Sequence, residues 1–167
     1  MLYPIQENGK WGYIDKTGKI VIKPTLSVSH ALPFYGPAAE VNNGAWWKEE
    51  SLIGGKWGLI DRRGKFLVQP EWDSISGFDN GYIIKNEGKY GFMNKKRKII
   101  LKPTFNNYPR FSDGVAWVWV GGKKVRYNQL DEGMEELPGF YYTGRKVGLI
   151  NTKLKFLIKP TIFDDVK

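Results

Sequence analysis

Short apolar runs alternate with polar, turn-forming segments along the whole chain. Tyr13-Ile14 and Ile20-Val21-Ile22, for example, flank the polar segment Asp15-Lys16-Thr17-Gly18. The apolar runs are rich in β-branched and aromatic residues, and Asp and Gly at the first and fourth turn positions favour a type I turn closed by a glycine bulge. No segment has the sustained 3.6-residue periodicity of a helix. The pattern therefore predicts β-hairpins.

The same hairpin pattern occurs four times. In each copy a glycine and a proline are twelve residues apart. The repeat cores are residues 10–24, 56–70, 89–103 and 146–160, and their characteristic residues are Trp11, Gly12 and Pro24; Trp57, Gly58 and Pro70; Tyr90, Gly91 and Pro103; and Gly148 and Pro160. We expect each proline to end the second strand of its hairpin, because proline has no N–H to donate to a β-ladder. Repeats of this size are typical of stacked arrays such as solenoids and propellers.

Two of the four turns lack the glycine. Gly18 and Gly64 occupy the fourth turn position in the first two copies, whereas Arg97 and Leu154 occupy it in the other two. A leucine held in the left-handed conformation costs on the order of 1–2 kcal/mol. We therefore expect the fourth turn to adopt a different conformation.

A further strand is predicted before most of the repeat cores. Segments 2–6, 81–85 and 140–142 each lead into a core through a short Gly-containing turn signal. We expect an all-β fold in which residues 1–167 form a single repeat domain of four tandem, mainly three-stranded antiparallel units. The unequal spacing of the copies favours an open twisted array, or solenoid. The alternative is a closed four-bladed, propeller-like ring, in which residues 2–6 would lie beside residues 162–166.

Two insertions explain the unequal spacing. The repeat glycines are 33 residues apart between the second and third copies, but 46 and 57 residues apart elsewhere. We place the insertions at about residues 42–51 and 121–137. Gly121-Gly122 is a favourable two-residue turn, so residues 115–127 are predicted to form an extra or elongated hairpin.

These motifs resemble the WG repeat family, also called KWG repeats. The resemblance rests on Lys-Trp-Gly at residues 10–12 and 56–58, on the Asp-x-x-Gly-Lys turn, and on the proline that follows the second apolar run. The third and fourth copies have lost the tryptophan and the turn aspartate. The resemblance implies a bacterial β-repeat protein with a structural or interaction role, and it brings no catalytic residue.

Charge is distributed unevenly along the chain. The formal net charge is +9, and the four repeat cores contain eighteen of the 26 basic residues but only two of the 17 acidic residues. Two interpretations remain open. The core lysines either pair with the acidic linkers, or form a positive stripe that attracts nucleic acid, an anionic glycan or an acidic protein. The densest basic segment contains Lys95, Lys96, Arg97 and Lys98.

Aromatic side chains are abundant and provide a second kind of candidate contact. Three of them share one repeat position, for which we expect packing between stacked repeats: Trp11, Trp57 and Tyr90. Two further pairs are Trp46 and Trp47 in the first insertion, and Trp117 and Trp119, which share one face of a predicted strand. Because tryptophan is enriched at binding hot spots, these two pairs are candidate interaction surfaces if they are exposed. The alternative is that they cover an interface between repeats.

Composition argues against several kinds of chemistry. The chain has no cysteine and a single histidine, His30, in a predicted linker. Disulfides, thiolate chemistry and any site with two imidazoles are therefore excluded. Gly54-Gly55-Lys56-Trp57 lacks the Ser or Thr that follows lysine in a phosphate-binding loop. We expect no enzyme activity, no catalytic residue, no cofactor and no metal site.

The sequence also predicts that the protein is cytoplasmic. The longest unbroken apolar run, Val115 to Val120, is far shorter than the ~20 residues of a membrane-spanning helix. The first residues lack the basic and apolar regions of a signal peptide. We therefore expect no membrane span.

Three functions are compatible with this pattern. The first is a non-enzymatic protein–protein interaction module, because stacked repeats present extended surfaces. The second is an anion-binding module, for nucleic acid or an acidic glycan, that uses the basic hairpins. The third is a small inhibitor or immunity-type protein that blocks an acidic cleft.

Overall fold

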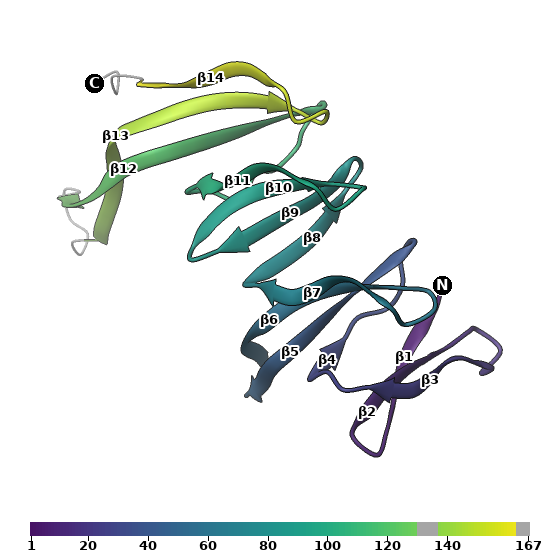
Figure 1. Ribbon diagram of the computed structural model, residues 1–167. Helices are drawn as coiled ribbons and strands as arrows, with labels where there is room; N and C mark the ends of the chain where they lie inside the picture. The colour runs from purple at the N-terminus through teal and green to yellow at the C-terminus, as the bar shows by residue number, and fades with distance from the viewer. Residues whose placement is uncertain (130–136, 163–167) are drawn as a thin grey trace. The chain divides into compact units, whose positions relative to one another are not determined.

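The computed structural model (Figure 1) describes residues 1–129 and 137–162, and these residues form four antiparallel sheets. Within each sheet, strands that are consecutive in sequence are neighbours. The first two sheets contain β1 (Tyr3–Glu7), β2 (Lys10–Ile14) and β3 (Ile20–Leu26), then β4 (His30–Ala31), β5 (Ala38–Lys48), β6 (Ser51–Asp61) and β7 (Phe66–Trp72). The other two contain β8 (Ser74–Phe78), β9 (Gly81–Asn86), β10 (Lys89–Asn94) and β11 (Ile99–Phe105), then β12 (Val115–Gln129), β13 (Leu137–Asn151) and β14 (Phe156–Ile162).

This architecture confirms the predicted all-β fold of four antiparallel units. Two of the sheets have three strands, as predicted, and two have four. None of the four sheets is closed into a barrel. The predicted ring contact between residues 2–6 and 162–166 involves residues 163–166, which lie outside the described part of the chain. Among the described residues, there is no helix that is long and apolar enough to cross a bilayer.

The four repeat hairpins are formed by β2–β3, β6–β7, β10–β11 and β13–β14. The prediction that a proline ends the second strand of each hairpin is wrong. Pro24 lies inside β3, which continues to Leu26. The pairing register changes between Trp11–Leu26 and Tyr13–Ile22, so Pro24 lies in a β-bulge. A bulge leaves an unpaired residue in the ladder, and the missing N–H of proline therefore costs no hydrogen bond there. Pro70, Pro103 and Pro160 occupy the same place in β7, β11 and β14.

The four repeat turns share one conformation, which contradicts the expectation for the fourth. The N–H of Gly18 donates to the carbonyl of Asp15 at 3.1 Å, and the N–H of Leu154 donates to that of Asn151 at 2.9 Å. Leu154 has a φ of 60° and Arg97 has a φ of 64°. The Leu154 side chain is buried, and burial of a leucine contributes about 1.5–3 kcal/mol. This gain offsets the conformational cost.

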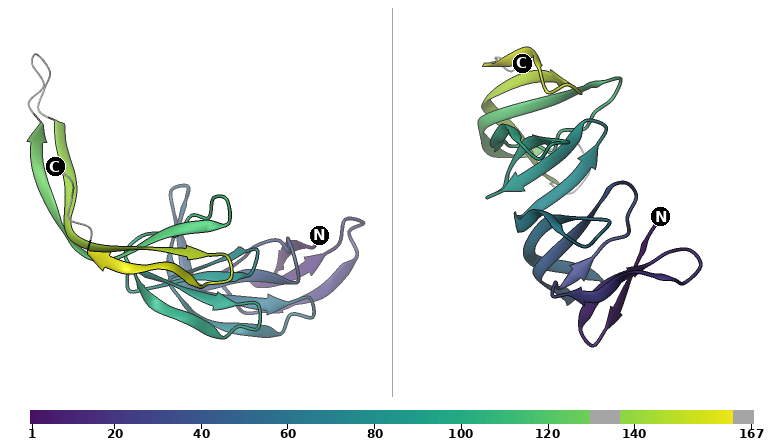
Figure 2. Two further views of the ribbon diagram at one scale, coloured as in Figure 1. Left: turned by 90° about the horizontal axis from the view of Figure 1, so that it is seen from above. Right: turned by 45° about the vertical axis from the view of Figure 1, so that its right-hand side comes forward.

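Both insertions extend hairpins. The first extends β5 and β6, which meet at the two-residue turn Glu49-Glu50. The second extends β12 and β13, so the elongated-hairpin alternative is confirmed. Gly121-Gly122 is not a turn, and neither is Thr143-Gly144, the turn signal that follows segment 140–142. Both pairs lie inside the two strands, where Gly121 pairs with Arg145 and Lys123 with Thr143. This long hairpin curves along its length (Figure 2). The connection at residues 130–136 lies outside the described residues.

The chain divides into two compact units. The first contains Met1–Gly88 and Phe92–Ile100, and the second contains Lys89–Gly91 and Leu101–Lys167. Within the first unit, two hydrophobic clusters lie on opposite sides of β6. Ile60 belongs to a cluster with Tyr13, Phe34 and Val41, whereas its neighbour Leu59 belongs to one with Trp72, Ile75 and Ile84. The second sheet is therefore packed on both faces, as expected for stacked repeats.

Candidate functional site

The elongated β5–β6 hairpin presents two exposed tryptophans. Trp46 and Trp47 have 58% and 60% of their surface accessible to solvent. They pair across the hairpin with Ile53 and Leu52, two residues and one residue away from the pair that closes the turn. Both residues therefore belong to the end of the hairpin.

The base of this hairpin is fixed by Asn42, which is fully buried. Its side-chain oxygen accepts from the N–H of Ala45 at 3.1 Å, and its amide nitrogen donates to the carbonyl of Gly54 at 3.4 Å. Gly44, Gly54 and Gly55 all have positive φ. A Cβ on Gly55 would collide with the Asn42 side chain, and a Cβ on Gly54 would collide with the Trp46 ring. Glycine at these positions therefore allows the hairpin to bend and lets Trp46 lie against the backbone.

Trp47 belongs to an aromatic cluster centred on the only histidine in the sequence. The His30 ring makes edge-to-face contacts with Trp11 and Trp47, both at 5.7 Å between centroids, and with Trp57 at 6.4 Å. We call these four residues the His30 cluster. Burial lowers the pKa of His30. His30 lies in β4 rather than in an open linker, and it connects the repeat tryptophans to the exposed hairpin.

Two of the repeat-position aromatics also pack on the hydrophobic clusters of the first unit. Trp11 is half-buried beside the cluster that contains Tyr13, and Trp57 is half-buried beside the cluster that contains Leu59. In the second unit, half-buried Tyr90 meets Tyr108 edge to face at 5.7 Å. The repeat aromatics are therefore boundary residues, with part of each ring open to solvent.

Trp117 and Trp119 lie on one face of β12 in the second unit. Trp117 is 53% exposed and pairs with Leu149. Trp119 is half-buried and pairs with Val147, and the guanidinium of Arg145 lies 5.6 Å from its ring centroid. A cation over an indole ring is a stabilising contact. Trp119 is thus partly covered by its own sheet, whereas Trp117 is available to a partner.

The basic segment 95–98 forms the β10–β11 turn, and all four side chains are exposed. The Arg97 guanidinium donates to the carbonyl of Lys95 at 3.4 Å. Elsewhere a repeat lysine does pair with an acidic linker, since Lys56 and Asp73 form an ion pair at 2.5 Å. That hydrogen bond lowers the pKa of Asp73. The structure brings Lys95 and Arg97, but neither tryptophan pair, to a cleft that the sequence did not predict.

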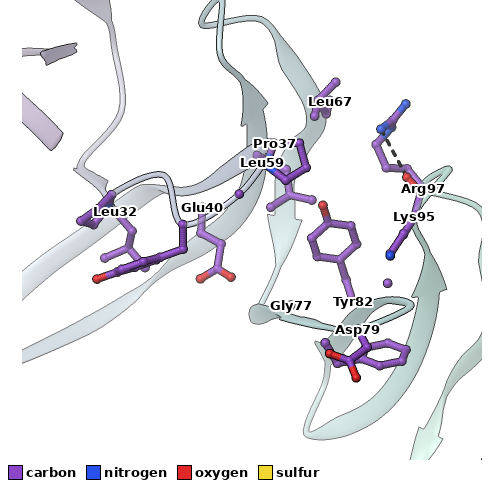
Figure 3. Close-up of a pocket in the computed structure, with 16 residues that line it drawn as sticks. Leu32, Pro37, Glu40, Leu59, Leu67, Gly77, Asp79, Tyr82, Lys95 and Arg97 are labelled. Carbon is purple, nitrogen blue, oxygen red and sulfur yellow. Dashed lines mark hydrogen bonds between the residues drawn. The ribbon is translucent and has the colours of Figure 1, made fainter. Parts of the chain in front are cut away.

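This cleft lies in the first unit and has a volume of about 650 Å³ (Figure 3). Apolar surface is supplied by Leu32, Pro33, Pro37, Ala38, Leu59, Leu67 and Phe78. Its ionisable side chains are Tyr35, Glu40, Asp79, Tyr82, Lys95 and Arg97. These side chains come from β5, from β9 and from three connections. The cleft is therefore assembled from segments that are far apart in sequence. Such a site fits a small molecule or a peptide segment.

One wall of the cleft, residues 32–37, is held in place by hydrogen bonds from three directions. The hydroxyl of fully buried Tyr13 donates to the carbonyl of Leu32 at 2.9 Å. The N–H of Phe34 donates to the carbonyl of Leu2 at 2.9 Å. Arg62 donates to the carbonyl of Gly36 at 3.1 Å, and its guanidinium lies 5.5 Å from the Phe34 ring centroid. The wall is therefore preformed.

Glu40 is a partly buried carboxyl group that faces the cleft. Its neighbours Ala39 and Val41 are buried on the other face of β5, which directs the Glu40 side chain toward the cleft. Burial raises its pKa, although the backbone N–H of Gly77 donates to the carboxylate. The pKa of Tyr82 is also raised, mainly by burial, with a smaller contribution from Glu40 and an opposing one from Arg97. The one sequence signal for this site is an acidic residue within the apolar segment 38–41.

Comparison with known families matches three segments of the chain. Residues 11–44, 57–89 and 90–123 match the model of the WG containing repeat. The fourth core, residues 146–160, lies outside the matched segments, but it has the same turn as the others and a register shift at the corresponding place, between Val147 and Leu149. Searches of curated proteins and of solved structures give no significant match. Within the described residues, no group of three or more His, Cys, Asp or Glu side chains could hold a metal ion.

Proposed function

We propose that this chain, which belongs to the WG containing repeat family, is a non-enzymatic module that binds another protein through the end of its β5–β6 hairpin. The observation that carries the proposal is the exposure of Trp46 and Trp47 at that end. Indole rings bury roughly 150–250 Å² each when they are covered. Exposed rings on a fixed hairpin therefore favour association with a partner.

The environment of the two rings supports a binding role. The hairpin is anchored at its base by buried Asn42, so little conformational entropy is lost when a partner binds the rings. Trp47 also rests against His30. Preorganised aromatic side chains of this kind are typical of residues that dominate the binding energy of an interface.

The non-enzymatic part of the proposal is supported by the surroundings of the ionisable residues. The only histidine in the sequence contacts three indole rings, which provide neither a nucleophile nor a carboxylate with which an imidazole could act. In the cleft, Glu40 is hydrogen-bonded to a backbone N–H. The residues that line the cleft include no serine, threonine or histidine, so the common pairings of a nucleophile with a base are not available there.

The proposal is tested by comparative capture from native lysate. Immobilised full-length protein, the Trp46→Ala/Trp47→Ala double variant and a Tyr3→Ala control, which removes an exposed aromatic ring from β1, are each incubated with the lysate. We expect a specific protein that the wild type and the control retain and the double variant loses. Far-UV circular dichroism checks that all three chains are folded. Equal capture by the double variant would contradict the proposal.

A second candidate function is anion binding by the β10–β11 turn. It is favoured by four consecutive exposed basic side chains, at residues 95–98. Titration of duplex DNA and of an anionic glycan at two salt concentrations tests it, because affinity due to charge falls steeply with salt. If neither probe binds in dilute salt, this function is excluded.

A further inference from the structure

The cleft of the first unit contains an anionic group, the carboxylate of Glu40, that has no cationic partner in the part of the chain that the structure describes. No lysine or arginine of the described residues forms an ion pair with Glu40, and the N–H of Gly77 is the hydrogen-bond donor to its carboxylate. Arg97 lies on the opposite side of the cleft from Glu40 in Figure 3. A half-buried carboxylate in this position has lost part of its hydration, which destabilises its charged form. A cationic group of a ligand would compensate for this loss through a charge-assisted hydrogen bond.

Apolar surface lies beside this carboxylate. Leu32 and Leu59 line the cleft near Glu40, and the Tyr82 ring lies between Leu59 and the β8–β9 turn (Figure 3). An aliphatic stem can pack on such surface while a charged group at its end meets the carboxylate. Both features belong to the side chains of lysine and arginine.

The size and the charge of the cleft favour a peptide over an isolated small cation. A volume of about 650 Å³ accommodates a long side chain together with adjacent main chain. Lys95 and Arg97 lie across the cleft from Glu40, whereas Asp79 lies on their side of it (Figure 3). The separation of Glu40 from the two basic groups can orient the dipoles and flanking charges of a peptide.

We propose that the cleft binds a basic side chain, lysine or arginine, presented by a peptide segment of a partner protein, with Glu40 as the acceptor of its charge. The aliphatic part of that side chain packs against Leu32, Leu59 and Tyr82. The site uses none of the residues of the β5–β6 hairpin end. The two proposals can therefore fail independently.

The test is an NMR titration of the ¹⁵N-labelled full-length chain with four capped tripeptides. Each peptide has alanine on both sides of a central arginine, lysine, norleucine or glutamate. We expect a basic peptide to shift the amide signals of Gly77 and Tyr82 with a dissociation constant on the order of 1 mM. The norleucine peptide should bind at least about tenfold more weakly, because it lacks the charge-assisted hydrogen bond.

Matched variants assign the effect to Glu40. Glu40→Gln keeps the size of the side chain and should weaken binding of the basic peptide by at least about tenfold. Glu71→Gln, which removes an exposed carboxylate of β7 outside the cleft, should leave binding unchanged. Binding to the wild type should also weaken on acidification, as Glu40 becomes protonated.

Three results would overturn the proposal. The first is the absence of saturable shifts with both basic peptides at roughly ten times the expected dissociation constant. The second is that the norleucine peptide binds the wild type as tightly as a basic peptide does, or that Glu40→Gln binds a basic peptide as tightly as the wild type does. Either result would indicate apolar contact alone. The third is preferential binding of the glutamate peptide, which would assign recognition to Lys95 and Arg97 instead.

Discussion

Gly12 faces Pro24 across the first repeat hairpin so closely that a Cβ on residue 12 would lie 2.6 Å from the proline nitrogen. The corresponding separations at Gly58–Pro70, Gly91–Pro103 and Gly148–Pro160 are 2.7, 2.6 and 2.9 Å. The twelve-residue spacing thus reflects a bulged pairing in which each partner has a necessary property. The glycine lacks a side chain, and the proline lacks an N–H.

Gly58→Ala should destabilise the first unit by more than about 2 kcal/mol, because the new methyl group would meet the backbone of β7 rather than a side chain that can move. Urea unfolding measures the change. Gly36→Ala is the control, since nothing lies within 4 Å of a Cβ at that position and its φ is not in the left-handed region. Similar losses in the two variants would contradict the bulge explanation.

Arg97→Gly should stabilise the protein by about 1 kcal/mol. Arg97 is exposed and has a φ of 64°, a conformation that glycine adopts without the steric cost of a Cβ. Leu154→Gly should instead destabilise it, because that side chain is buried. Chemical denaturation of the two variants measures both effects, and a stabilised Leu154→Gly would show that its burial contributes little.

Acidification should weaken the first two repeat turns. In each turn the aspartate accepts backbone N–H bonds, as Asp61 does from Arg63 at 2.8 Å and from Lys65 at 2.9 Å. For Asp15 the bonds to Thr17, and for Asp61 those to Lys65 and Arg63, lower the pKa below the ordinary value of 3.8. This stability is present above pH 3.8 and is lost as the pH falls through the lower pKa of the folded state.

The Asp15→Asn/Asp61→Asn double variant should show a flatter dependence of unfolding free energy on pH below about 4. Its turns should persist at neutral pH, because Asn94 already accepts the same bond from Lys98 at 3.0 Å. Urea unfolding at a series of pH values measures the difference. A profile parallel to that of the wild type would exclude these two carboxyls as its source.

Tryptophan fluorescence should report the protonation of His30. An imidazolium quenches nearby indoles, and burial lowers the pKa of His30 below its ordinary value of 6.5, so the midpoint should lie below that pH. The unfolded chain binds the proton at higher pH, and unfolding free energy should therefore fall as the pH decreases below 6.5. His30→Asn should remove both transitions. A transition that persists in His30→Asn would belong to another group.

The sequence predicts the repeating fold well because its determinants are local. The Asp15 turn and the β-branched strands that flank it lie within fifteen residues of one another, and the glycine–proline spacing marks each copy. The prediction of a turn at Gly121-Gly122 is wrong for the opposite reason. A pair of glycines has the local signature of a turn, and only the distant pairing of β12 with β13 shows that it lies inside a strand.

The candidate sites also differ in whether their sequence signals are local or depend on contacts between distant segments. Trp46 and Trp47 were identifiable, because two adjacent tryptophans in a polar insertion are unusual in any conformation. The cleft was not, because Glu40, Tyr82 and Arg97 come together only when the second and third sheets pack. Likewise, nothing in the segment around His30 indicates that Trp11 and Trp57 converge on it.

The central claim, that the β5–β6 hairpin end is a protein-binding surface, is tested most directly by hydroxyl-radical footprinting of the complex with the captured partner. Oxidation of Trp46 and Trp47 is measured by mass spectrometry in the free chain and in the complex, with Tyr3 as an internal reference. We predict strong protection of both tryptophans and unchanged oxidation of Tyr3. Equal oxidation of Trp46 and Trp47 in the free and bound chain would contradict the account.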